Sequence, residues 1–140
     1  MTKIAVVYYS MYGHVGKLAE SIKAGASSVP GVEVELYQVQ ETLPDDLLKQ
    51  LHAPPKPDIP VATPETLKNA DGILLGFPTR FGMVPSQVKA LFDGCGGLWA
   101  GKALIGKPAG MFFSTGSPNG GQEVTAMSTM PFLAHQGMTI

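Results

Sequence analysis

Short apolar runs alternate with helix-like stretches along the chain, and this alternation constrains the fold more than any other feature. The apolar runs cover residues 3–9, 32–39, 71–78 and 108–116, and helical patterns follow at 14–28, from 63, at 85–93 and from 122. Near-continuous apolar runs are typical of strands buried on both faces of a parallel sheet. The sequence predicts one α/β domain over residues 1–140, with a doubly wound parallel sheet of strand order 2-1-3-4-5.

Two segments depart from this rhythm. In 32–39, valines and leucine alternate with Glu33 and Glu35, which predicts a strand at the sheet edge. Residues 40–64 hold half of the twelve prolines, so we expect an extended surface excursion with one short helix at 45–52. Thr63, Pro64 and Glu65 then form a typical helix start.

Composition excludes several function classes. A formal net charge of −1 gives no electrostatic footprint for nucleic acid or an anionic membrane. Cys95 is the only cysteine, so we predict no disulfide framework and no metal site, and a lone thiol favours a reducing, cytoplasmic location. No stretch resembles a signal peptide or approaches the roughly 20 apolar residues of a transmembrane helix.

Three loops could carry chemistry, because ligands of such sheets bind at the carboxyl ends of the strands where the strand order reverses. These loops are 10–15 (SMYGHV), 78–82 (PTRFG) and 114–121 (STGSPNGG). In the first loop, free amides at a helix N-terminus could hold a phosphate without any basic side chain, helped by the Ser10 hydroxyl and by Gly13. The alternative is an ordinary capped helix.

The second and third loops suit a flat ring. Backbone and hydroxyl groups could meet the polar edge of a heteroaromatic cofactor, and Arg80 could stabilise electron density on a reduced flavin. The alternative for Arg80 is a solvated surface charge. The third loop has three side-chain hydroxyls and flexible backbone donors, and its alternative is a plain surface turn.

Two other nucleotide motifs are not supported. The first loop lacks the G-x-G-x-x-G pattern of dinucleotide-binding sites. GGLWAGKA at 96–103 nearly matches a phosphate-binding P-loop, but Ala103 lacks the magnesium-binding hydroxyl and the segment follows a helix rather than a strand.

Taken together, YYSMYGH, PTRFG, GGLWA, STGS with GGQE, and LAHQGM resemble the WrbA-type NAD(P)H:quinone oxidoreductases of the flavodoxin-like superfamily. The resemblance runs from residue 3 to 140. It implies a non-covalently bound FMN, NADH or NADPH as co-substrate, a quinone as electron acceptor, two-electron ping-pong reduction and a homo-oligomer, usually a tetramer. The flavin would carry the chemistry, so no nucleophile is required.

The resemblance also implies roles for particular residues. His135 would contact FMN and take a catalytic role. The other residues that would bind FMN form three groups: Ser10, Met11, Tyr12, Gly13, His14 and Val15; Thr79, Arg80 and Phe81; Ser114, Thr115, Gly116, Ser117, Pro118 and Asn119. Tyr12 and Trp99 would contact the substrates. From the residues alone, Trp99 could equally be a core side chain and His135 a structural one.

Three features depart from the family pattern. Pro118 and Asn119 stand in a loop that is usually richer in glycine, and Pro131 falls within the last predicted helix, where an interior proline costs roughly 3 kcal/mol or kinks the helix. The fifth strand is represented only by its expected start at 137–140, and the last helix is missing. We therefore expect an uncovered sheet face, and marginal stability, because such a helix provides on the order of 10 kcal/mol of gross burial.

Two other functions compete with the reductase. One is a flavodoxin-like electron carrier, although such carriers are usually strongly acidic. The other is an inactive form that associates with longer relatives.

Overall fold

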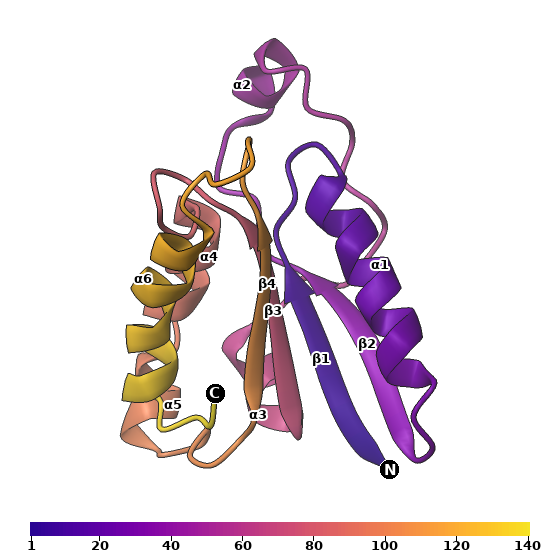
Figure 1. Ribbon diagram of the computed structural model, residues 1–140, viewed down its shortest axis with the longest axis vertical. Helices are drawn as coiled ribbons and strands as arrows, with labels where there is room; N and C mark the ends of the chain where they lie inside the picture. The colour runs from indigo at the N-terminus through magenta and orange to yellow at the C-terminus, as the bar shows by residue number, and fades with distance from the viewer.

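The computed structural model describes residues 1–140, with a four-stranded parallel sheet at its centre (Figure 1). Its strands stand in the order β2-β1-β3-β4, and their bounds are β1 Thr2–Tyr8, β2 Val32–Gln38, β3 Gly72–Pro78 and β4 Ala109–Ser114. In the register of the sheet, Val6 of β1 is paired with Leu36 of β2 and with Leu74 of β3. The predicted flavodoxin-like order is confirmed, and β2 is an edge strand as expected.

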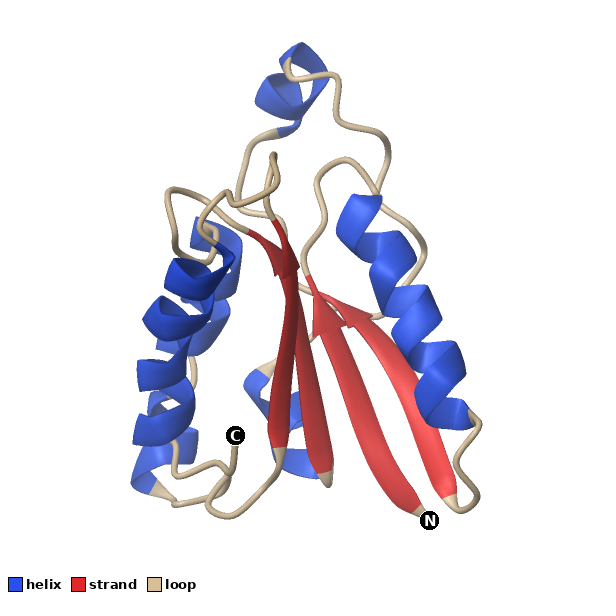
Figure 2. Ribbon diagram, viewed as in Figure 1, coloured by secondary structure: helices blue, strands red, loops and turns tan.

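Helices lie on both faces of the sheet (Figure 2). Their bounds are α1 His14–Ser27, α2 Asp45–Gln50, α3 Pro64–Asn69, α4 Ser86–Asp93, α5 Gly96–Ala100 and α6 Gln122–His135. Thr63 begins α3 as predicted, because its hydroxyl accepts from the Thr66 amide and the Thr66 side chain accepts in return from the Thr63 amide. No helix combines the length and the apolar composition that crossing a bilayer requires.

Alternate side chains of β1 enter two separate cores. Val6 and Tyr8 pack with Val15 and Ala19 of α1 on one face. The side chains on the opposite face join a larger core, to which helices α3 to α6 contribute Leu67, Val88, Phe92, Leu98 and Leu133. Because successive strand side chains point to opposite faces, both faces of β1 must be apolar, which explains the continuous apolar run.

The face that carries α1 is only partly covered (Figure 1). An apolar groove of about 410 Å³ lies there, lined by Ile4, Ala26, Val29, Val32, Gly72, Ile73, Leu74, Pro108, Ala109 and Gly110. At the outer edge of the sheet, Thr139 forms a single parallel bridge with Pro108. The expected start of a fifth strand is therefore present as one residue pair beside β4, and no further helix covers this face.

Helix α6 runs through Pro131 and ends at His135. The sequence predicts that an interior proline destabilises or kinks the helix, because proline has no amide hydrogen to donate to the carbonyl four positions earlier. In the structure one helix continues across Pro131. The Pro131 side chain is exposed, and Thr125, Thr129 and Leu133 fix the helix through their buried side chains.

Candidate functional site: a cleft at the carboxyl ends of the strands

The three predicted loops converge on one cleft beyond the carboxyl ends of β1, β3 and β4. The cleft has a volume of about 560 Å³, within the usual range for small-molecule sites. Its lining consists of Ser10, Met11, Tyr12, His14, Val15, Pro78, Thr79, Arg80, Ser114, Thr115 and Gly116. Segments that are about a hundred residues apart in the sequence thus share one surface because parallel strands all end at the same edge.

The first loop presents unpaired amides to this cleft. Gly13, the N-cap of α1, has a positive φ of 92°, and its amide donates to the Ser10 hydroxyl over 3.0 Å. The first amide of the helix with a backbone acceptor is that of Lys17, which bonds the Gly13 carbonyl, and those of His14, Val15 and Gly16 have no acceptor within the protein. The loop therefore concentrates donors and the positive end of the helix dipole at one point.

The second loop is held by α6. The Thr79 hydroxyl accepts from the Gly82 amide over 3.1 Å, and it pairs over 2.7 Å with the hydroxyl of Thr125. Ser128 of α6 donates to the Gly82 carbonyl over 2.7 Å. These bonds fix Thr79 at the cleft and leave the Arg80 side chain exposed beside it, whereas Phe81 is fully exposed at the tip and does not line the cleft.

Only the first half of the third loop reaches the cleft. Thr115 is held from both sides, since its hydroxyl donates to the Ser117 carbonyl over 2.8 Å and accepts from the Gln122 amide group over 2.8 Å. Ser117, Pro118 and Asn119 are exposed and do not line the cleft, and Asn119 has a positive φ of 56°. Pro118 and Asn119 thus form an outer turn in this loop.

The chemistry of the lining suits an anionic ligand with a polar aromatic ring. No carboxylate lines the cleft, and His14 and Arg80 are the basic side chains in its wall. Hydroxyls come from Ser10, Thr79, Ser114 and Thr115 together with the unpaired amides of α1. These donors fit the phosphate, hydroxyl-bearing chain and heteroaromatic edge of FMN, so the residues present are compatible with that cofactor.

Trp99 and His135 are not brought to this cleft within one copy of the chain. Trp99 lies on α5 and is 61% exposed, and His135 is the exposed last residue of α6. Helix α6 starts next to the third loop and extends away from it over about 20 Å, so its last residues lie near the amino ends of the strands, away from the cleft (Figure 1). The sequence suggested their function but could not show this separation, because it depends on the direction in which each helix runs.

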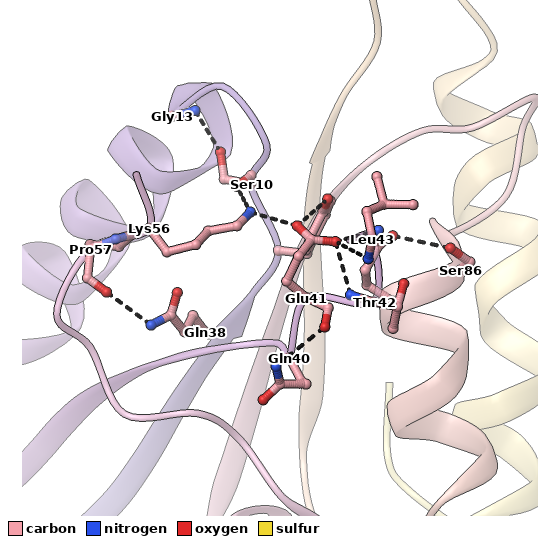
Figure 3. Close-up of polar contacts among 12 residues, drawn as sticks. Ser10, Gly13, Gln38, Gln40, Glu41, Thr42, Leu43, Lys56, Pro57 and Ser86 are labelled. Atoms are coloured by element: carbon pink, nitrogen blue, oxygen red, sulfur yellow. Dashed lines mark hydrogen bonds and ion pairs between the residues drawn. The ribbon is translucent and has the colours of Figure 1, made fainter. Parts of the chain in front are cut away.

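The sequence did not reveal the residues that support the first loop from behind (Figure 3). Lys56, within the proline-rich excursion, donates to the Ser10 carbonyl over 3.0 Å and forms an ion pair with Glu41 over 2.9 Å. The Tyr12 hydroxyl donates to the Leu51 carbonyl over 3.0 Å. The excursion, treated from sequence as a mere surface segment, is therefore bound to the candidate site, and a lone lysine between three prolines was the available signal.

Comparison with known proteins decides the family. Residues 2–140 match the family described as NADPH-dependent FMN reductase. The chain belongs to this family. The prediction of a flavodoxin-like oxidoreductase that works with FMN and NAD(P)H is confirmed at the level of the family.

Individual relatives of this FMN reductase family member are close in sequence. It is 59% identical over 137 residues to the quinone-oxidoreductase QR2 of Triphysaria versicolor, covering 98% of this chain and 67% of that protein. It is 54% identical over 136 residues to the NAD(P)H quinone oxidoreductase PST1 of Candida albicans, covering 97% of this chain and 68% of that protein. The chain thus spans about two thirds of the length of these relatives.

Solved structures agree on the fold. The crystal structure of a WrbA-like flavodoxin from Agrobacterium tumefaciens superposes with a TM-score of 0.71 at 24% identity, covering 99% of this chain and 75% of that one. At this level of identity the likeness shows the fold alone, and the shared fold places the three loops of the FMN reductase family member at the same edge of the sheet.

Proposed function

We propose that this chain is an FMN-dependent NAD(P)H:quinone oxidoreductase that reduces quinones to hydroquinones by two-electron, ping-pong turnover. The observation that supports it best is the cleft itself, where unpaired amides of α1 and hydroxyls from three loops face a space without carboxylates. Relatives that carry the name quinone oxidoreductase, at 54–59% identity, support the quinone as acceptor.

When bound, FMN would supply the chemistry, accepting a hydride from NAD(P)H and passing two electrons to a quinone. The protein's task is to hold it. The amides of His14, Val15 and Gly16, with the Ser10 hydroxyl, would bind the phosphate, while Thr79, Ser114 and Thr115 would donate to and accept from the polar groups of the cofactor. Arg80 places a cation at the same edge.

We further propose that the active form is a homo-oligomer, such as a tetramer, in which Trp99 and His135 approach the cleft of a neighbouring copy. Their distance from the cleft within one chain supports this, as do the exposed apolar side chains of Val124, Met127 and Met130 along α6. Sedimentation of the flavin-loaded protein at several concentrations tests the assembly. A monomer at all concentrations would contradict it.

We also propose that residues 1–140 act as one flavodoxin-like domain and that the protein is cytoplasmic, which the lone free thiol of Cys95 supports.

The decisive experiment is a titration of the folded chain with FMN, followed by steady-state oxidation of NADH and of NADPH with benzoquinone. We expect saturable binding, turnover and parallel double-reciprocal plots. Binding without turnover would instead indicate an electron carrier. A colourless protein that takes up no FMN would indicate a form that depends on longer relatives.

A further inference from the structure

Glu41 is a partly buried carboxylate whose oxygens accept hydrogen bonds from several parts of the chain (Figure 3). Its side chain is 11% exposed. The donors, with their distances, are the Tyr9 hydroxyl at 2.9 Å, the Lys56 ammonium at 2.9 Å, the Gln87 amide group at 2.8 Å and the backbone amides of Thr42 at 2.9 Å and Leu43 at 3.2 Å. Glu41 thereby joins the end of β1, the excursion and α4 at one point behind the first loop.

Lys56 links Glu41 to the first loop. It stands between Pro55 and Pro57, whose rings fix their own backbone φ, so the segment that presents it has little freedom. Its ammonium lies over the ring of Tyr9, 4.6 Å from the ring centre, and contacts both Glu41 and the Ser10 carbonyl oxygen. We call the ion pair of Glu41 and Lys56, with its bond to Ser10, the clasp.

The hydrogen bond from Lys56 to the Ser10 carbonyl fixes the orientation of the whole Ser10–Met11 peptide group. In a planar trans peptide the carbonyl and the following amide point in opposite directions. When the Ser10 oxygen points to Lys56, the Met11 amide must point away from it, and this amide has no acceptor within the protein. The orientation of this peptide also sets the start of the turn in which the Ser10 hydroxyl accepts from Gly13.

We propose that Glu41 and Lys56 are positioning residues for the phosphate-binding loop, and that the clasp holds the Ser10–Met11 peptide in its ligand-binding orientation. This inference rests on the proposed function. Lys56 acts here through geometry rather than through charge, because Glu41 neutralises it at 2.9 Å.

Comparing two ligands separates positioning of the phosphate loop from general damage. Riboflavin has the same ring and side chain as FMN but no phosphate. For Lys56→Met we expect the Kd of FMN to rise about tenfold or more, the loss typical of a bond to a charged donor, with the Kd of riboflavin changed less than about threefold. Lys56→Arg, which keeps a cationic donor, should restore most of the FMN affinity. Lys49→Met, the same charge change at an exposed position of the same excursion, should leave both constants unchanged.

Glu41→Gln separates geometry from charge. If Lys56 attracted the phosphate by its charge, removal of the neutralising carboxylate would tighten FMN binding. The clasp predicts weaker FMN binding, again with a small effect on riboflavin. Tighter binding in Glu41→Gln, equal losses for both flavins in Lys56→Met, or no loss for either would overturn the inference.

A measurement on the flavin-free chain keeps this result separate from the proposed function. The Gly13 amide is protected by its bond to the Ser10 hydroxyl, and the Lys17 amide of α1 by its bond to the Gly13 carbonyl. Hydrogen exchange of both amides should accelerate in Lys56→Met and Glu41→Gln but not in Lys49→Met. If the wild-type chain binds no FMN, the reductase proposal fails, and unchanged exchange in these variants would separately disprove the clasp.

Discussion

The hydroxyls of Thr79 and Thr125 lie 2.7 Å apart, joining the second loop of the cleft to the first turn of α6 across 46 residues of sequence. Thr125 is fully buried, and its hydroxyl also lies within hydrogen-bonding distance of the Gly121 carbonyl oxygen, at 3.1 Å. This contact makes the geometry of a cleft residue depend on a helix that does not itself line the cleft.

Replacing Thr125 by valine should lower the free energy of unfolding by about 1 kcal/mol, because the side-chain shape is kept while a buried hydrogen bond is lost. Urea denaturation of the purified variant measures this. Thr2→Val, at an exposed position of β1 whose side chain makes no hydrogen bond, serves as the control and should show no loss. An unchanged midpoint for Thr125→Val would show that the hydroxyl pair contributes nothing.

Two glycines next to and within α1 should respond in opposite directions. Gly13→Ala should destabilise the protein by about 1 kcal/mol, since a φ of 92° strains any residue with a Cβ although the space there is open. Gly25→Ala, in the exposed last part of the helix with equally open space, should stabilise it by up to about 1 kcal/mol. Thermal melts of both variants decide the matter, and effects of the same sign would contradict the backbone geometry of the first loop.

The free energy of unfolding should fall at acid pH, and part of this fall should depend on Glu41. Burial alone would raise the pKa of Glu41, but hydrogen bonds from Lys56, Gln87, the Leu43 amide and Tyr9 outweigh it and lower the pKa to about 2. A carboxyl whose pKa is lower in the folded state stabilises the fold above its unfolded pKa, and this contribution is lost as the pH falls from about 4.5 to about 2.

Unfolding free energies of the wild type and of Glu41→Gln, measured from pH 7 downward, test this linkage. We expect the difference between them to be largest above about pH 5 and to shrink toward pH 2. Asp46→Asn, at an exposed position of α2, removes the same charge and is the matched control for a change in net charge alone. A difference between Glu41→Gln and the wild type that stays constant down to pH 2 would argue against an ionised, hydrogen-bonded Glu41.

Cys95 should be chemically inert in the folded protein. It is fully buried, its thiol donates to the Leu91 carbonyl over 3.2 Å, and burial raises its pKa to about 11. Since the thiolate is the reactive form, an aromatic disulfide reagent should label Cys95 only as fast as the chain unfolds, and at once in denaturant. Rapid labelling of the native protein would show that the α4–α5 corner opens readily.

The sequence alone determined the layered α/β fold, the strand order and the three loops of the cleft. These follow from local patterns: the apolar runs that become strands buried on both faces, the alternation of β2, and the turns after Tyr9, Phe77 and Phe113. Since parallel strands end at one edge, the meeting of the loops required no knowledge of side-chain packing.

Only the tertiary structure decided which residues support the cleft and which stay away from it. The bond from Lys56 to Ser10 spans 46 residues and depends on how a proline-rich segment folds back, and no periodicity in the sequence encodes that path. His135 and Trp99 resemble site residues in sequence, yet they lie on α6 and α5, whose positions keep both residues away from the carboxyl ends of the strands and from the cleft. Local sequence patterns determine where each helix and strand forms. Which elements contact one another depends on long-range contacts, because a contact between distant segments depends on the path of every element between them.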